Sequence, residues 1–127
     1  MSKYEDKIEH LLKVGHVEYQ REISFPDLKD KELLRFDFGI YKNKKLIGII
    51  EVDGEQHFQP VDLFGGKDEF KRVRKTDRLK NRYCLLHKIP LFRIPYTVLE
   101  TFQLSDLQNF LVKNQCHNDN IINGRKN

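Results

Sequence analysis

Residues 35–58, RFDFGIYKNKKLIGIIEVDGEQHF, constrain the fold most, because they predict two strands joined by a tight turn at residues 42–45. Side chains of a strand alternate between its two faces, so Asp37 points away from the phenylalanines beside it, and Glu51 and Asp53 share a face. If the strands pair antiparallel, Asp37 lies beside Glu51 or close to it. Crowded carboxylates repel one another unless they bind a cation or share a proton. The stretch therefore predicts a divalent-metal site.

The rest of the 127-residue chain predicts a single domain built around this hairpin. Apolar spacing predicts further strands and helices on both sides of it: helices over residues 2–14 and 67–87, strands over residues 16–25 and 90–96, and a last helix capped by Ser105. Residues 26–32 and 58–66 read as connections. The order αβββαβα predicts a central mixed β-sheet flanked by helices, in the α/β (α+β) class. We assign residues 1–115 to this domain and residues 116–127 to a flexible C-terminal tail.

The charge of the chain is concentrated in one segment. Lysine and arginine (23) exceed aspartate and glutamate (19), giving a net charge of +4, and residues 67–88 hold nine basic residues against three acidic ones. Such a stripe suits a polyanion such as nucleic acid, although a solvated helix face explains the charge equally well. The two cysteines lack zinc-site spacing, and no apolar run approaches the ~20 residues of a membrane helix. We therefore expect a cytoplasmic protein without membrane contact.

Hydrolysis of a phosphodiester by a metal requires hard oxygen ligands and an activated water. Asp37 and Glu51 supply two such ligands, and the backbone carbonyl of Val52 adds a third. Magnesium keeps several waters, so two or three protein ligands are enough. His57 follows the acidic strand directly and suits a proton-transfer role or a ligand role, with a structural histidine as the alternative.

Three further charged residues are candidates from the predicted helices. Asp77 and Lys80 interrupt the apolar stripe of the helix over residues 67–87, so they either reach the site or form an exposed ion pair with each other. Glu5 lies at the edge of the apolar arc of the first helix. It either reaches toward the sheet or completes a capping box with Ser2.

Four segments, FDFGIY, LIGIIEVDGEQHF, KTDRLKN and IPLFRIPY, together resemble the PD-(D/E)xK nuclease superfamily. Within it the chain is most similar to the branch of very-short-patch-repair endonucleases and EDxHD-type phage homing endonucleases, over residues 5–99. The resemblance implies a restriction-endonuclease-like fold and magnesium-dependent cleavage of DNA, with manganese as a substitute. It also implies an intracellular setting, phage-encoded in a bacterial host.

The resemblance implies a role for each acidic position. Asp37 matches the metal-binding aspartate of the superfamily and Glu51 matches the acidic residue of its half-motif, whereas Asp53 stands where that half-motif has lysine. His57 and Asp77 stand where the named branch has a histidine and a helical aspartate. Glu5 matches an acidic residue of the first helix, and Lys80 restores a positive charge from the long helix.

These observations lead to one main hypothesis, a magnesium-dependent DNA endonuclease with no small-molecule cofactor. Its expected catalytic residues are Glu5, Asp37, Glu51, Asp53, His57, Asp77 and Lys80. Its expected phosphate contacts are Lys42, Lys44, Lys45, Lys71, Arg74, Lys75 and Arg78. The resemblance implies either a homodimer or recognition of DNA structure. The alternative is a weakly active or inactive nuclease fold that grips DNA or a partner protein, which the absence of the lysine at Asp53 supports.

Overall fold

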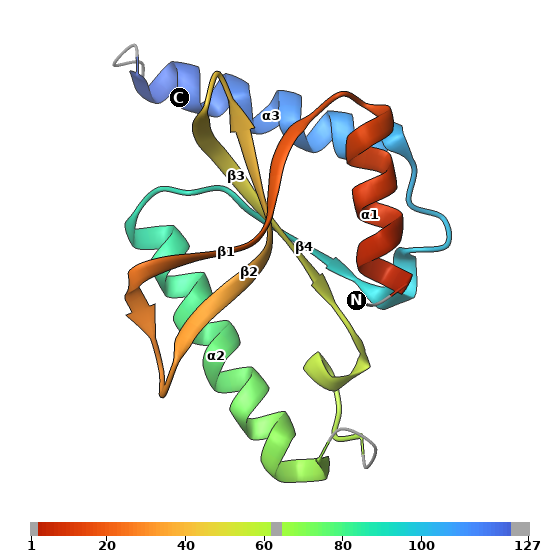
Figure 1. Cartoon of the computed structure of the whole chain (residues 1–127), viewed down its shortest axis with the longest axis vertical. Helices are drawn as coiled ribbons and strands as arrows, with labels where there is room; N and C mark the ends of the chain where they lie inside the picture. The colour runs from red at the N-terminus through yellow and green to blue at the C-terminus, as the bar shows by residue number, and fades with distance from the viewer. Residues whose placement is uncertain (1–2, 62–64, 123–127) are drawn as a thin grey trace.

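The computed structural model of the chain describes residues 3–61 and 65–122. Its elements follow one another as α1 (Lys3–Val14), β1 (Glu18–Lys29), β2 (Leu33–Lys42), β3 (Lys45–Asp53), the 3-10 turn η1 (Glu55–His57), α2 (Gly66–Leu86), β4 (Leu91–Pro95), the 3-10 turn η3 (Tyr96–Val98) and α3 (Leu104–Ile122) (Figure 1). No helix of this described part is long and apolar enough to cross a membrane.

The strands form one sheet in the order β1-β2-β3-β4. The pairs β1–β2 and β2–β3 are antiparallel, and β3–β4 is parallel, with α2 as the crossover between its two strands. The predicted class, a mixed sheet flanked by helices, is confirmed. The predicted tight turn is also present, because Asn43 and Lys44 both adopt positive φ (51° and 66°), as a two-residue hairpin turn requires.

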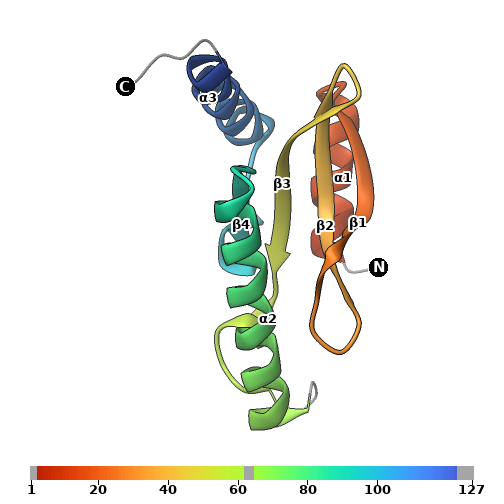
Figure 2. The same cartoon turned by 90° about the vertical axis from the view of Figure 1, so that its left-hand side faces the viewer.

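Two apolar clusters hold helices against opposite faces of this sheet. In the view of Figure 2, α1 and α2 lie on opposite sides of β3. The first cluster joins Ile8 and Leu12 of α1 and Leu107 of α3 to strand residues such as Ile50. The second cluster joins Cys84 of α2 to the other side of the strands. Because neighbouring residues of β3 pack into different clusters, α2 is fixed on one face and α1 with α3 on the other.

The prediction that the apolar side chains of β2 all lie on one face of the sheet is wrong at one point. Phe38 packs in the cluster of α1 and α3, whereas Phe36 packs in the cluster of α2. The facing residue of β1, Glu22, lies between the pairs Arg21↔Phe38 and Ile23↔Phe36 and has φ 53°, a left-handed conformation that distorts the strand. Asp37 therefore lies where β2 changes the face that its apolar side chains cover.

Several predicted boundaries shift. The connection expected over residues 26–32 is strand as far as Lys29, because β1 is an edge strand that tolerates Pro26 and buries Leu28. Ser105 does not cap α3, which begins at Leu104.

The helix α3 ends later than expected, and one expectation at the start of the chain is untested. The helix α3 continues to Ile122, into the predicted tail, and the remaining residues 123–127 lie outside the described part. Ser2, half of the expected capping box, lies outside it too. The capping alternative for Glu5 is therefore untested.

Gly39 offers a test of how closely β1 and β2 pack. A Cβ atom there would lie 2.7 Å from Cδ1 and 3.2 Å from Cγ2 of Ile23, so we expect Gly39→Ala to lower the free energy of unfolding. The expected loss is about 1–3 kcal/mol, the usual cost of overpacking. At Gly48 the nearest atom would be the carbonyl oxygen of Pro90 at 3.5 Å, so Gly48→Ala is the matched control. Urea unfolding of both variants checks the difference, and equal losses would contradict this packing.

Candidate functional site

Asp37 and Glu51 lie side by side where β2 and β3 separate. Pairing of the two strands extends from Lys42↔Lys45 to Phe38↔Ile50, with one register shift between Tyr41 and Ile40. Beyond it, the backbone N–H of Asp37 donates to Oε1 of Glu51 (2.6 Å), and the N–H of Val52 donates to Oδ2 of Asp37 (2.7 Å). Side-chain carboxylates thus accept bonds from amides at the point where the ladder ends. The predicted proximity of Asp37 and Glu51 is confirmed.

The Asp37 side of this pair lies among acidic groups. Glu51 is only 2 % exposed. Burial and the charge of Glu51 raise the pKa of Asp37 to about 8, against the bond from the Val52 amide, which lowers it. Glu5 of α1 raises that pKa further by its charge and by a side-chain hydrogen bond with Asp37. Glu5 therefore reaches the sheet, as one of its two alternatives predicted, with Arg21 3.7 Å away.

Lys80 compensates the other end of the pair. Its Nζ donates to Oε2 of Glu51 (2.9 Å) and lies 5.3 Å from the ring centroid of Phe36. Its side chain is 13 % exposed. The alternative in which Lys80 points to solvent and pairs with Asp77 is therefore wrong.

His57 faces Asp77 across the gap between η1 and α2. Its Nδ1 lies 2.8 Å from Oδ2 of Asp77 and 3.6 Å from Oδ1 of Asp53. Burial lowers the pKa of His57, but the hydrogen bond to Asp77 and the charges of both carboxylates raise it, and the net direction is upward. A carboxylate on Nδ1 fixes the ring orientation and leaves Nε2 for other partners.

Arg93 is the residue of this site that sequence reasoning missed. It stands opposite Glu51 in the β3–β4 pairing. Its Nη1 lies 2.9 and 3.2 Å from the two oxygens of Asp53, 3.5 Å from Oδ1 of Asp77 and 4.0 Å from Oε2 of Glu51. The available signal was a charged residue inside the apolar run LFRIP, since such a residue needs a partner when buried.

All seven residues predicted as catalytic belong to one contact network. One half joins Glu5, Asp37, Glu51 and Lys80, and the other joins His57, Asp77 and Asp53 through Arg93. A cavity of about 840 Å³ opens beside this network, between the start of β2 and α2, and His57, Asp77 and Lys80 form part of its wall.

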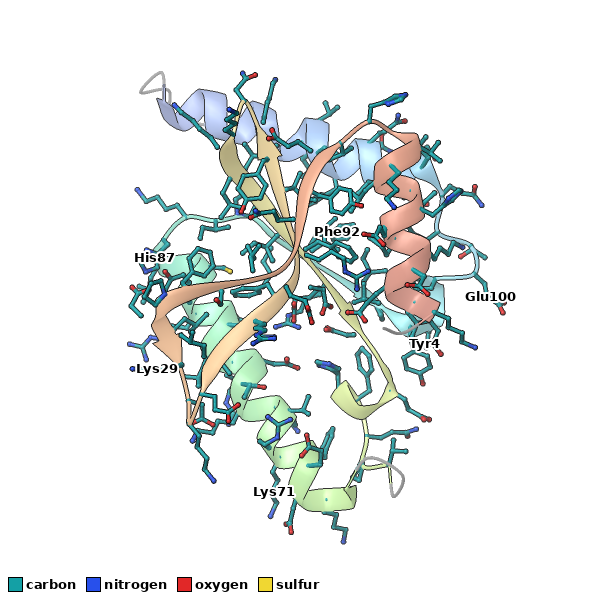
Figure 3. All side chains as sticks on the ribbon, in the orientation of Figure 1. Tyr4, Lys29, Lys71, His87, Phe92 and Glu100 are labelled. Carbon is teal, nitrogen blue, oxygen red and sulfur yellow. The ribbon has the colours of Figure 1, made fainter. Side chains whose placement is uncertain are left out.

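The residues predicted to contact phosphates divide into two groups. Those of α2 lie on its exposed face, with Lys71 toward its N-terminal end (Figure 3): Lys71, Arg74, Lys75 and Arg78. Lys42, Lys44 and Lys45 lie at the β2–β3 turn, at the other end of β3 from Glu51 (Figure 1). The strand rise of about 3.3 Å per residue puts about 20 Å between that turn and Glu51. The turn therefore lies away from the acidic pair.

No group of three or more histidine, cysteine or acidic side chains in the described part of the chain has an arrangement that suits a metal ion. Magnesium, however, needs only one or two carboxylates when waters complete its coordination. Burial, and after it the charges of Glu51 and Glu5, raise the pKa of Asp37, and a bound cation would favour its charged form. Asp37 and Glu51 thus fit magnesium as a two-carboxylate site, with the Val52 carbonyl as the third ligand predicted from the sequence.

No protein-family model, curated protein or solved structure matches this chain. The nuclease resemblance therefore stays a prediction.

Asp37 should make stability depend on pH. Its carboxyl has a pKa of about 8 in the folded chain, above the ordinary value, so the folded state binds this proton more tightly than the unfolded state. The free energy of unfolding should therefore fall as pH rises from about 4 to about 8. Asp37→Asn, which is neutral throughout, should escape this loss and become more stable than the native chain at the upper end.

Urea unfolding in chelator at several pH values between 5 and 8 measures this difference. Asp68→Asn, at an exposed position of α2, is the matched control and should follow the native chain. If the stability difference between Asp37→Asn and the native chain is the same at every pH, the carboxyl of Asp37 is not held in its protonated form.

Proposed function

We propose that this chain is a magnesium-dependent DNA endonuclease whose metal is held by Asp37 and Glu51. The observation that carries the proposal is the Asp37–Glu51 pair itself, since two amides aim both carboxylates at one place and Lys80 contacts Glu51. The resemblance of residues 5–99 to PD-(D/E)xK nucleases supports it. A mixed sheet with helices on both faces is compatible with a restriction-endonuclease-like fold.

Each residue of the network has a distinct part in this proposal. Bound magnesium would polarise the scissile phosphate and make the attacking water more acidic. Asp37, Glu51 and the Val52 carbonyl hold the ion. Lys80 keeps Glu51 in place through its 2.9 Å bond and brings to the phosphate the positive charge that Asp53 lacks. Glu5 completes the acidic end.

His57 is the residue that moves a proton. Asp77 holds its Nδ1, and its Nε2 has no hydrogen-bond partner among the described residues. His57 also forms part of the cavity wall. Its free nitrogen can therefore take a proton from water or give one to the leaving oxygen of a bound strand.

The exposed face of α2 supplies the contacts with the DNA backbone. Basic residues recur there at helical spacing: Lys67, Lys71, Arg74, Lys75, Arg78 and Arg82. A helix of 21 residues is about 30 Å long, so this row can follow several phosphates. Lysine contacts of this kind position a duplex without reading its bases.

A second function, binding of DNA or a partner protein without cleavage, has one observation in its favour. Glu51 and Asp53 already have cationic partners in Lys80 and Arg93, which reduces the need for a metal. The two functions differ in chelator, where a binding module keeps its affinity for DNA and shows no cleavage with any divalent ion.

Replacement of the metal ligands tests the main proposal. We expect Asp37→Asn and Glu51→Gln each to lower the cleavage rate by a factor of about 100 or more, because loss of metal stabilisation removes several kcal/mol. The assay is a panel of duplex, nicked, branched and single-stranded DNA, and RNA, with magnesium or manganese. Glu100→Gln, exposed beyond η3, is the control and should cleave at the native rate. Native rates for both ligand variants would end the assignment.

The role of α2 has its own test. Lys71→Gln with Arg78→Gln should weaken DNA binding for every sequence and reduce the slope of log affinity against log salt by about 2. Fluorescence anisotropy at several salt concentrations measures both quantities. Lys113→Gln on α3 removes one exposed charge elsewhere and should change neither. An unchanged slope in the double variant would remove α2 from the interface.

A further inference from the structure

Arg93 occupies the centre of the charged network, on the strand that the proposed mechanism does not use. The parallel pairing of β3 and β4 sets Arg93 opposite Glu51, so its side chain shares a face with Glu51 and Asp53. Its Nε donates to Oδ1 of Asn81 in α2 (2.9 Å), which anchors the base of the guanidinium. The planar head then extends between Asp53 and Asp77.

The guanidinium group is packed in a way that leaves buried polar atoms without hydrogen bonds, which lowers stability. The buried atoms Nη2 of Arg93 and Oδ1 of Asp77 have no hydrogen-bond partner among the described residues. Unpaired buried polar atoms cost free energy, so each calls for a specific explanation, and a role in a catalytic site is one of these. Nη1 instead is shared among three carboxylates, those of Asp53, Asp77 and Glu51.

We infer that Arg93 is a positioning residue: its guanidinium holds Asp53 away from His57 and keeps the Asp77 carboxylate on Nδ1, so that the imidazole presents Nε2 to the cavity. The charged groups that face His57 come from three elements, Asp53 of β3, Asp77 of α2 and Arg93 of β4. Two of them are carboxylates within 3.6 Å of the same nitrogen. Only one of them can hold the Nδ1 proton well.

Asp53 and Asp77 compete for Nδ1 of His57, and Arg93 favours Asp77 there because its own closer contacts are with Asp53. Both Asp53 oxygens lie within 3.2 Å of Nη1, whereas the Asp77 oxygen near it lies at 3.5 Å. The charge of Arg93 also lowers the pKa of His57, against the two carboxylates that raise it. Asp53 therefore anchors Arg93. In this way the residue at the position where the superfamily has a lysine helps to orient His57.

The inference deepens the proposed function and depends on it only for its effect on cleavage. Removal of the guanidinium should free Asp53 to turn to His57 and leave both carboxylates uncompensated. In Arg93→Gln we expect the pKa of His57 to rise by about one pH unit and its neutral form to lose its single tautomer. Imidazole nitrogen spectra of the metal-free protein across pH report both quantities. Lys113→Gln should leave them as in the native chain.

Arg93→Lys keeps the charge and protects the fold if Arg93→Gln does not fold. A lysine ammonium keeps a cation near Asp53 and Asp77 but lacks the Nε bond by which Asn81 anchors the guanidinium, so the pKa of His57 should rise by a smaller amount. A folded Arg93→Gln or Arg93→Lys protein with the native pKa and tautomer of His57 would overturn the inference.

Cleavage kinetics separate this inference from the proposed function. In Arg93→Gln the acid limb of the pH–rate profile should move to higher pH by the same amount as the pKa of His57, with DNA affinity unchanged. If the native chain cleaves no substrate, the proposed function fails while the imidazole spectra still decide the role of Arg93. If the native chain cleaves and the acid limb does not move, the inference fails and the proposed function stands.

Discussion

The reciprocal bonds between two carboxylates and two strand amides determine this site. The Asp37 amide donates to Glu51, and the Val52 amide donates to Asp37, at the point where β2 and β3 stop pairing. Each bond satisfies an amide that the ladder no longer pairs, and each fixes a carboxylate that the backbone would otherwise leave mobile. Two carboxyl groups thus lie together at one place, with Glu51 buried and Asp37 partly buried. Cationic side chains compensate part of this negative charge and that of Asp53 beside it.

The compensating cations come from elements far apart in the sequence. Lys80 of α2 contacts Glu51, and Arg93 of β4 contacts Asp53 and Asp77. At Asp37, burial and the charge of Glu51 instead raise the pKa to about 8. Of the three strand carboxyl groups, Asp37, Glu51 and Asp53, only Asp37 has no cationic partner in the described part of the chain. That position is where the proposed metal would bind.

Local patterning predicted much of this arrangement. The hairpin turn and the period-two alternation were enough to place Asp37 beside Glu51, because both are short-range properties of the chain. The change of face at Phe36 was not predictable in this way, since it lies opposite Glu22, whose left-handed conformation on the neighbouring strand has no signal in the sequence pattern. Arg93 was missed for a similar reason. Its partners depend on the parallel pairing of β3 with β4, which only the tertiary fold decides.

The carboxyl carbon of Asp37 offers the most direct test of the central claim, that this pair is built to hold a divalent cation. Its resonance should titrate near pH 8 in chelator, which follows from the raised pKa of Asp37. Saturating magnesium should bring the titration well below neutral pH, because a bound cation favours the charged carboxylate. The same measurement in Glu51→Gln should show a weaker magnesium effect. A titration that magnesium leaves unchanged in the native chain would contradict the account.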